Sequence, residues 1–471
     1  MNIENIDIER IVLEVCEKLQ NATAPSFNED QLEKKAKGIY NDPNEAIEKA
    51  YLAQRELFEM TLSDRKRITD SIKSHLLKYV RELSQMVVAE TGMGNVKDKI
   101  IKNTLAIEKT PSTEDLRAGV FTGDDGLTLL ELSPFGVIGA ITPSTNPTET
   151  VICNTIGMVA AGNSVVFAPH PGAYKSSNRC VELINEAIIM AKGPKNLVVI
   201  IDNPSIEKSE IVMKHKKINL LCATGGPALV KAVLSSGKKA IGAGAGNPPV
   251  FVEETANIEK AAKDIVDGAS FDNNLPCISE KEAIVMDRVF DYLVFNMKSH
   301  GAYEIKERET IDKLQKLLVP EKWKPNRKFI GKDAKEILKA IGIDAEDHIR
   351  LIIMEVEEDH PFVIEELMMP VLPMVRVNTV KEGIDLAVKV EHGFRHTAIC
   401  HSKDIDVLTE MGHRIQTTIF VKNGPSYAGI GVGGEGYTTF TIAGPTGEGL
   451  TSASTFTRKR RCALIGGFTI R

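Results

Sequence analysis

The sequence is poor in cysteine, and its cysteines form no recognisable framework. Seven of the 471 residues are cysteines, an odd number, at positions 16, 153, 180, 222, 277, 400 and 462. There is no CxxC pair and no cysteine–histidine spacing of the zinc type. These absences exclude a disulfide scaffold and a zinc module, and they predict a reducing cytosol in which most thiols are buried.

Long hydrophobic runs and an excess of basic charge are also missing. No apolar run approaches the length of a membrane span, and the N-terminal MNIENIDIER lacks the basic region of a secretion signal. The chain has 58 Lys and Arg against 64 Asp and Glu, and this net charge of −6 argues against nucleic-acid binding. We expect the short basic run Arg458–Arg461 to be a solvated turn or an ion-pairing strand.

What is present indicates a globular protein of two or more domains. Hydrophobic residues make up 42% and charged residues 26%, and the chain is too long for one ordinary core. Residues 30–110 show helical spacing, and residues 119–133 read as a β-hairpin. From residue 134 onward, short buried strands such as SVVFAP alternate with helices, which predicts parallel α/β sheets.

An amphipathic pattern precedes this body at residues 5–20, NIDIERIVLEVCEKLQ. Its apolar residues fall on one helical face, and the polar, proline-containing segment after it is typical of a linker. Two interpretations stay open. The helix packs on its own body, or it is a detachable peptide that docks on another protein.

A strand–turn–helix pattern at residues 220–230, LLCATGGPALV, is a weak nucleotide signal. Gly225 and Gly226 would let backbone N–H groups approach a phosphate at the positive end of the helix. Pro227 suits the first helical position. The segment is not GxGxxG and lacks the lysine of a P-loop, so a plain turn is the simpler interpretation.

Three polar segments hold further candidate residues. Cys277 lies in FDNNLPCISE, where a nucleophilic thiol and a loop cysteine without a role are equally compatible with the composition. An asparagine in TPSTNPTE could donate to an oxyanion or belong to an ordinary turn. One glutamate of Glu365-Glu366 could bind a ribose, or both could cap a helix.

In order along the chain, these segments resemble the aldehyde dehydrogenase superfamily over roughly residues 30–471. SPFGVIGAITPSTNP is similar to the family's strand and loop with the catalytic asparagine, and AGNSVVFAPHP to its cofactor-binding strand. CATGGPALV is similar to the turn under the pyrophosphate, and NNLPCISE to the nucleophile segment. EELMMPV is similar to E-E-x-x-G-P, with Met369 in place of glycine.

Two departures from the hydrolytic branch narrow the resemblance. Hydrolytic members carry a water-activating glutamate in E-L-G-G, where this sequence has Gly242 or a neighbour. Their lysine after the buried strand is replaced here within Ala168–Pro171, which departs from the usual adenosine-ribose contacts. Both departures, with EHGFRHTA, GGEGYTTFTIAGPTGEG and TFTRKRRC, resemble CoA-acylating enzymes, closest to the propionaldehyde and acetaldehyde dehydrogenases of bacterial microcompartments.

The resemblance implies a fold, a site and no metal. The expected fold is α/β and aldehyde dehydrogenase-like, with a Rossmann-type cofactor domain, an α/β catalytic domain and an oligomerisation β-hairpin. Cys277 would be the nucleophile and Asn146 the oxyanion donor, with Thr145 as the runner-up. The residues expected to bind NAD are Thr224, Gly225, Gly226, Pro169, His170 and Glu366. The expected segments are an encapsulation helix (1–20), a linker (21–29), a cofactor-binding domain (30–247) that includes the hairpin 119–133, a catalytic domain (248–440) and a C-terminal oligomerisation segment (441–471).

The implied function is CoA-dependent oxidation of a short-chain aldehyde, propionaldehyde foremost, with NAD as acceptor. The N-terminal helix would bind a shell protein inside a microcompartment in the cytoplasm, and the enzyme would be a homodimer or homotetramer. Alternatives are acetaldehyde as the main substrate, a hydrolytic enzyme that releases free acid, and a semialdehyde reductase. A catalytically degenerate shell-interaction protein is the alternative from a different class.

Overall fold

The computed structural model describes residues 37–321, 324–468 and 470. The predicted N-terminal helix (1–20) and the whole predicted linker (21–29) lie outside the described residues. The chain divides into two compact units. Unit 1 contains the residues up to Glu90, Ile100–Ala243 and the residues from Tyr437, and unit 2 contains Thr91–Lys99 and Gly244–Gly436.

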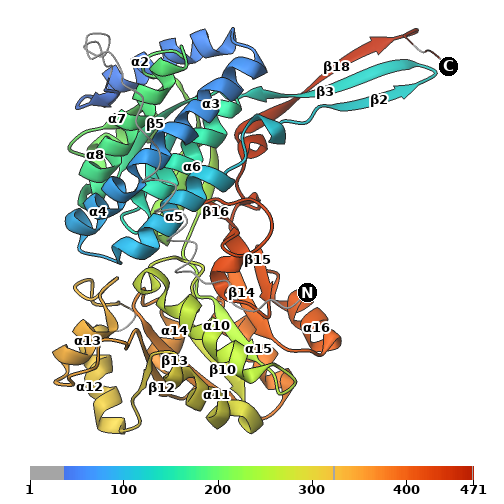
Figure 1. Ribbon diagram of the computed structural model, residues 1–471. Coiled ribbons are helices and arrows are strands. Elements are labelled where there is room, and N and C mark those ends of the chain that lie inside the picture. The colour runs from blue at the N-terminus through green and yellow to red at the C-terminus, as the bar shows by residue number, and fades with distance from the viewer. Residues whose placement is uncertain (1–36, 322–323, 469, 471) are drawn as a thin grey trace. The chain divides into compact units, whose positions relative to one another are not determined.

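Unit 1 is built on a six-stranded parallel sheet with helices on its faces (Figure 1). In sheet order its strands are β1 (Ile39–Tyr40), β6 (Val198–Ile201), β5 (Ser164–Pro169), β4 (Val137–Thr142), β7 (Ile218–Thr224) and β8 (Lys239–Ala243). Its helices are α2 (Pro43–Phe58), α3 (Leu62–Leu76), α4 (Val80–Thr91), α5 (Val96–Lys109), α6 (Pro147–Ala160), α7 (Tyr174–Met190), α8 (Ile206–Lys214) and α9 (Pro227–Leu234). The last residue of α4 and the first turn of α5 count with unit 2.

The strands in the centre of this six-stranded sheet have sequences that are apolar on both faces, as is typical of a parallel sheet. Every residue of β4, β5 and β6 is buried, as expected when helices cover both sides of a sheet. Helix α6 is buried along its whole length, so it lies in the interior of the unit. The predicted alternation of strands and helices is confirmed here.

The predicted hairpin is confirmed and gains a third strand. β2 (Gly119–Gly123) and β3 (Gly126–Pro134) are antiparallel around the turn at Asp124 and Asp125. β18 (Thr457–Ile465), which contains the basic run, pairs with β3 along its length. This three-stranded sheet projects from unit 1 as a long ribbon (Figure 1). A short pair, β16 (Ile442–Ala443) and β17 (Gly449–Leu450), precedes β18.

Unit 2 contains a seven-stranded parallel sheet. In sheet order its strands are β11 (Ala302–Glu304), β12 (Leu351–Glu355), β13 (Val371–Val377), β10 (Glu282–Met286), β9 (Pro249–Val252), β14 (Thr397–His401) and β15 (Ile419–Lys422). Its helices are α10 (Ile258–Ser270), α11 (Asp287–Ser299), α12 (Arg308–Leu318), α13 (Ala334–Ala340), α14 (Pro361–Ile364), α15 (Val380–Val390) and α16 (Ile405–Ile415). Phe251, Ile284 and Phe362 lie in its core, and burial of each such side chain stabilises the fold by about 1.5–3 kcal/mol.

Candidate active site

Cys277 differs from the other cysteines of the described residues because it is half-buried. Four others are buried and one is exposed, namely Cys153, Cys180, Cys222, Cys400 and, in β18, Cys462. Burial raises the pKa of Cys153, Cys222 and Cys400 to about 12, so these thiols stay protonated at neutral pH. Partial exposure is what a reactive thiol needs, and the structure gives it to Cys277.

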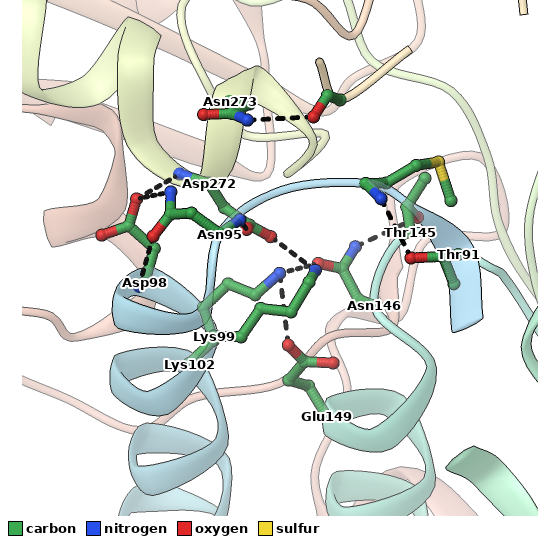
Figure 2. A network of polar contacts seen from close by, with 12 residues as sticks. Thr91, Asn95, Asp98, Lys99, Lys102, Thr145, Asn146, Glu149, Asp272 and Asn273 are labelled. Atoms are coloured by element: carbon green, nitrogen blue, oxygen red, sulfur yellow. Dashed lines mark hydrogen bonds and ion pairs between the residues drawn. The ribbon is translucent and has the colours of Figure 1, made fainter. Parts of the chain in front are cut away.

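A strained turn leads into Cys277. Asp272, Asn273 and Asn274 have φ values of 48°, 55° and 64°, a left-handed run that costs of order 1–3 kcal/mol per residue. The Lys99 ammonium donates to Asp272 Oδ2 at 2.9 Å, and the two side chains are 1% and 0% exposed. Asp98 Oδ2 accepts the Asp272 N–H at 2.8 Å (Figure 2). This buried ion pair holds the turn and thereby fixes the backbone that carries the thiol.

Lys281 holds the same segment from its other side. This buried ammonium donates to Asn274 O at 2.9 Å and to Asn274 Oδ1 at 2.6 Å. Burial lowers the pKa of Lys281, and the negative charges of Glu366 and Cys277 are the largest effects that oppose this shift. Lys281 and Cys277 thus lie close enough for their charges to interact, and a protonated Lys281 would favour the thiolate.

Glu366 belongs to the same group of charges. It follows α14 and is half-buried. Burial raises the pKa of its carboxyl, while the charge of Lys281 and a hydrogen bond with the Gly246 backbone hold it down. The carboxylate is placed to accept hydrogen bonds, as the predicted ribose contact requires.

His396 belongs to the same group of residues, although sequence reasoning did not identify it as a candidate. A Cβ atom on Gly246 would lie 2.7 Å from the Cys277 carbonyl oxygen and 2.8 Å from His396 Cγ, so these three residues are in tight contact. His396 Nδ1 lies 2.9 Å from Thr397 Oγ1. Burial, and then the charge of Lys281, lower the pKa of His396 to about 4. The imidazole is therefore neutral at physiological pH, so its ring offers one hydrogen-bond donor and one acceptor.

The sheet of unit 2 explains why these distant residues meet. Gly246, Lys281 and His396 each lie just before a strand, respectively β9, β10 and β14. Those strands are parallel neighbours, so their amino ends share one edge of the sheet. Glu366 precedes β13, which neighbours β10. The nucleophile and its charged neighbours therefore gather at the amino edge of this sheet.

In unit 1 the candidate residues lie at the carboxyl edge of the sheet, not at its amino edge. The chain leaves β4 toward β5 and later returns to place β7 on the other side of β4. This is a topological switch point, where ligands of open α/β sheets bind at the carboxyl ends of the strands. Thr145 and Asn146 follow β4, and Thr224 ends β7.

The turn after β7 is open to solvent at the start of α9. Gly226 is exposed at the N-cap, and a Cβ atom there would meet nothing within 4 Å. The Gly225 N–H already donates to Ala243 O at 3.0 Å, so that group does not face a ligand. Thr224 is buried, and its hydroxyl lies 2.9 Å from Thr441 Oγ1. The available N–H donors of this turn therefore begin at Gly226, and phosphate binding there stays a prediction.

Pro169 and His170 end the strand on the other side of β4. Thr142 pairs with Pro169, so both lie at the same carboxyl edge. Pro169 is buried and His170 is exposed. His170 Nδ1 accepts the Gly172 N–H at 3.0 Å and caps the turn that leads into α7.

Asn146 is a helix N-cap whose side chain does not cap. Such a cap is commonly worth about 1 kcal/mol, and here it is not made. Asn146 Oδ1 instead accepts from the Lys102 ammonium at 2.6 Å, and its amide nitrogen donates to Thr145 Oγ1 at 3.3 Å. Glu149 lies 3.2 Å from the same ammonium (Figure 2). With one N–H bond on Thr145, the amide keeps its second N–H bond as a donor.

Position 242 has no room for the side chain of hydrolytic enzymes. Gly242 lies in β8, and a Cβ atom there would stand 2.8 Å from Val230 Cγ1. Its N–H donates to Thr446 Oγ1 at 3.2 Å. A glutamate at this position would require Val230 to move.

Neither a metal centre nor a membrane helix emerges from the part of the chain that the structure describes. No group of three or more His, Cys, Asp or Glu there could hold a metal ion. None of the described helices is long and apolar enough to cross a bilayer.

Comparisons with known proteins agree with this geometry. The model of the aldehyde dehydrogenase family matches residues 15–440. The chain is 48% identical to the CoA-propanoylating propanal dehydrogenase of Citrobacter freundii, over 96% of this chain and 98% of that protein.

Solved structures extend the likeness to the whole fold. A propionaldehyde dehydrogenase of Rhodopseudomonas palustris, with bound CoA and an acylated cysteine, is 58% identical with a TM-score of 0.91, over 92% of this chain and 100% of that one. A propionaldehyde dehydrogenase from the fucose-utilisation microcompartment of Clostridium phytofermentans is 52% identical with the same TM-score and the same coverage. The predicted fold class is confirmed.

Proposed function

Because the chain belongs to the aldehyde dehydrogenase family, we propose that it oxidises propionaldehyde to propionyl-CoA, with NAD as the hydride acceptor. The relatives in Citrobacter and Rhodopseudomonas carry the same activity in their names. The proposal assigns chemistry to Cys277 and its neighbours in unit 2, and binding and oxyanion contacts to the strand ends of unit 1.

In the first half-reaction the Cys277 thiolate attacks the aldehyde carbon and forms a thiohemiacetal. The charge of Lys281 favours the thiolate, and the oxyanion accepts hydrogen bonds from the Cys277 N–H and the Asn146 amide. Thr145 supports that amide through its hydroxyl. The former aldehyde carbon loses its hydride and becomes the thioester carbon on Cys277, and NAD held at the strand ends of unit 1 would be the acceptor of that hydride.

The residues proposed for NAD fit an anionic dinucleotide. The Gly226 turn presents backbone N–H groups at the positive end of α9, with Thr224 and Gly225 as its frame. Pro169 and His170 line the neighbouring strand end. The Glu366 carboxylate is an acceptor suited to the hydroxyl groups of a ribose.

In the second half-reaction the CoA thiol displaces Cys277 from the thioester. The observation that carries this step is the crowding at Gly242, which leaves no base there to activate water. His396 is neutral and lies close to Gly246, which also lies close to the Cys277 carbonyl oxygen, and we propose that it accepts the proton of the CoA thiol. The thiolate then attacks the acyl carbon, and the Cys277 thiolate leaves.

The test is NADH formation from propionaldehyde and NAD, with and without CoA, with the acyl product identified by mass spectrometry. We expect steady turnover only with CoA, and propionyl-CoA as the product. Steady NADH release with free propionate and no CoA would identify a hydrolytic enzyme instead. A comparison of kcat/KM for acetaldehyde tests the other alternative, because one methylene is worth about 1–3 kcal/mol in a pocket.

We also propose assembly partners for two segments. The apolar stripe of residues 5–20 would dock on a microcompartment shell protein, as fits a relative from such a compartment. The ribbon of β2, β3 and β18 exposes Val120, Phe121 and Ile465, which favours a homodimer or homotetramer. Light scattering of the full chain and of a chain without residues 1–20, with co-purification of shell protein, tests both.

A further inference from the structure

The contacts of Asn146 carry an inference that rests on the proposed function. We propose that Lys102, held by Glu149, is a positioning residue that fixes the Asn146 amide with its oxygen occupied, one N–H bond on Thr145 and the other N–H bond directed to the oxyanion. Lys102 does not touch the substrate in this proposal. It acts through Asn146.

The first step concerns which way the amide faces. Asn146 Oδ1 is 2.6 Å from the Lys102 ammonium, and an ammonium has donors and no acceptor. A flipped amide would set its NH₂ against that ammonium, donor against donor, inside a site where both side chains are buried. The ammonium therefore selects the orientation in which the nitrogen is available, and the opposite orientation would present an oxygen to an oxyanion.

The second step concerns why the lysine can be charged there. The Lys102 and Glu149 side chains are both 0% exposed and lie 3.2 Å apart. Glu149 stands in the first turn of α6, where the helix dipole favours a carboxylate. The Phe440 ring centroid lies 5.9 Å from the ammonium, within cation–π range. These contacts compensate the buried charge, and the charge polarises the amide so that its N–H bonds donate more strongly.

The third step concerns the cap that is given up. Asn146 occupies the N-cap of α6, yet its oxygen accepts from Lys102 rather than from the first turn of the helix. A residue that needed only to start the helix would keep its cap. The hydrogen bond from Lys102 therefore orients the Asn146 amide as a donor, at the expense of the N-cap that would stabilise α6.

The experiment measures the NADH burst of a single turnover, without CoA, in Lys102→Met, Asn146→Ala and the double variant. We expect Asn146→Ala to slow the burst about 10²-fold, as for the loss of one oxyanion donor. Lys102→Met should slow it at least about 10-fold, and the double variant should be no slower than Asn146→Ala. Alkylation of Cys277 by iodoacetamide should keep its rate in all three, because the nucleophile is untouched.

Lys97→Met is the matched control, since Lys97 lies exposed on the same helix and should leave the burst unchanged. If Lys102→Met does not unfold cooperatively, Glu149→Gln takes its place and should slow the burst in the same direction. A wild-type burst rate in the folded variant, or effects that multiply in the double variant, would overturn the inference. A wild-type enzyme with no burst at all would instead refute the proposed function.

Discussion

The two units hold their candidate residues at opposite edges of their sheets. In unit 1 the candidate residues follow strands, so they offer a helix N-terminus and backbone N–H groups to a ligand. In unit 2 they precede strands and are titratable side chains whose pKa values are shifted mainly by burial. This difference indicates that the two units have different chemical roles. Fixed dipoles suit the binding of an anionic cofactor, and buried charges suit covalent chemistry.

Removal of the Cys277 thiol should abolish the covalent chemistry that is assigned to unit 2. Cys277→Ala should lower turnover by at least about 10³-fold, because no other group of the site can carry the acyl chain. The unfolding transition should stay cooperative. The exposed Cys462 provides the control, and Cys462→Ala should keep full activity, measured as CoA-dependent NADH formation. Substantial turnover by a pure, folded Cys277→Ala protein would disprove the assignment.

Replacement of His396 separates the two half-reactions. His396→Gln should keep the first NADH burst and slow the CoA-dependent steady state by about 10²-fold, the usual size of a general-base effect. Stopped-flow absorbance resolves the two phases. His413→Gln, at an exposed position of α16, should change neither. An equal loss in both phases would show that His396 acts before acyl transfer or only supports the fold.

Buried histidines also predict an acid limit to stability. Burial lowers the pKa of His396 to about 4 and that of His401 to about 3, from an ordinary value of 6.5. Between pH 6.5 and the lowered pKa of each histidine, the unfolded chain binds more protons than the folded chain. The free energy of unfolding therefore falls as pH drops from 6.5 toward 4. At pH 5 each histidine should remove about 2 kcal/mol relative to pH 7.

Urea titrations at pH 7 and pH 5 measure this effect. His401→Asn should reduce the difference between the two pH values by about the contribution of one histidine, about 2 kcal/mol. An unchanged pH dependence in that variant would contradict the role given to its burial.

The smallest predicted effect concerns Gly242 in unit 1. Gly242→Ala should lower the free energy of unfolding by about 1–3 kcal/mol, because its Cβ would overlap Val230. Val230→Ala in the same chain should recover part of the loss. Gly226→Ala, where space is open, should cost about 0.5 kcal/mol or less. A fully stable Gly242→Ala protein would show that the crowding is not real.

Sequence reasoning reached the strands and turns because local patterns specify them. Short apolar runs predicted β4, β5 and β7, and Asp124-Asp125-Gly126 predicted the hairpin turn. It did not find β18 as the third strand of the ribbon, since that pairing joins distant segments.

The site shows the same limit. Cys277 and Asn146 stand in recognisable polar segments, whereas Lys102 reaches Asn146 across 44 residues of sequence. His396 and the Cys277 backbone both lie close to Gly246 only because of the order of β9, β10 and β14 in the sheet. From sequence alone, a charged residue in a helix is expected to lie on the solvent-exposed face, and only the packing shows that it is buried. A test for buried lysines near candidate catalytic amides would have found Lys102.

Acyl transfer through Cys277 is tested most directly on the intact protein. The enzyme is mixed with propionaldehyde and NAD without CoA, quenched in acid, digested and analysed by mass spectrometry, and a second sample receives CoA before the quench. A propionyl group on the peptide that contains Cys277, lost with the appearance of propionyl-CoA in the second sample, is the predicted result. An unmodified Cys277 peptide in the first sample, or loss of the acyl group to free propionate at the same rate without CoA, would contradict it.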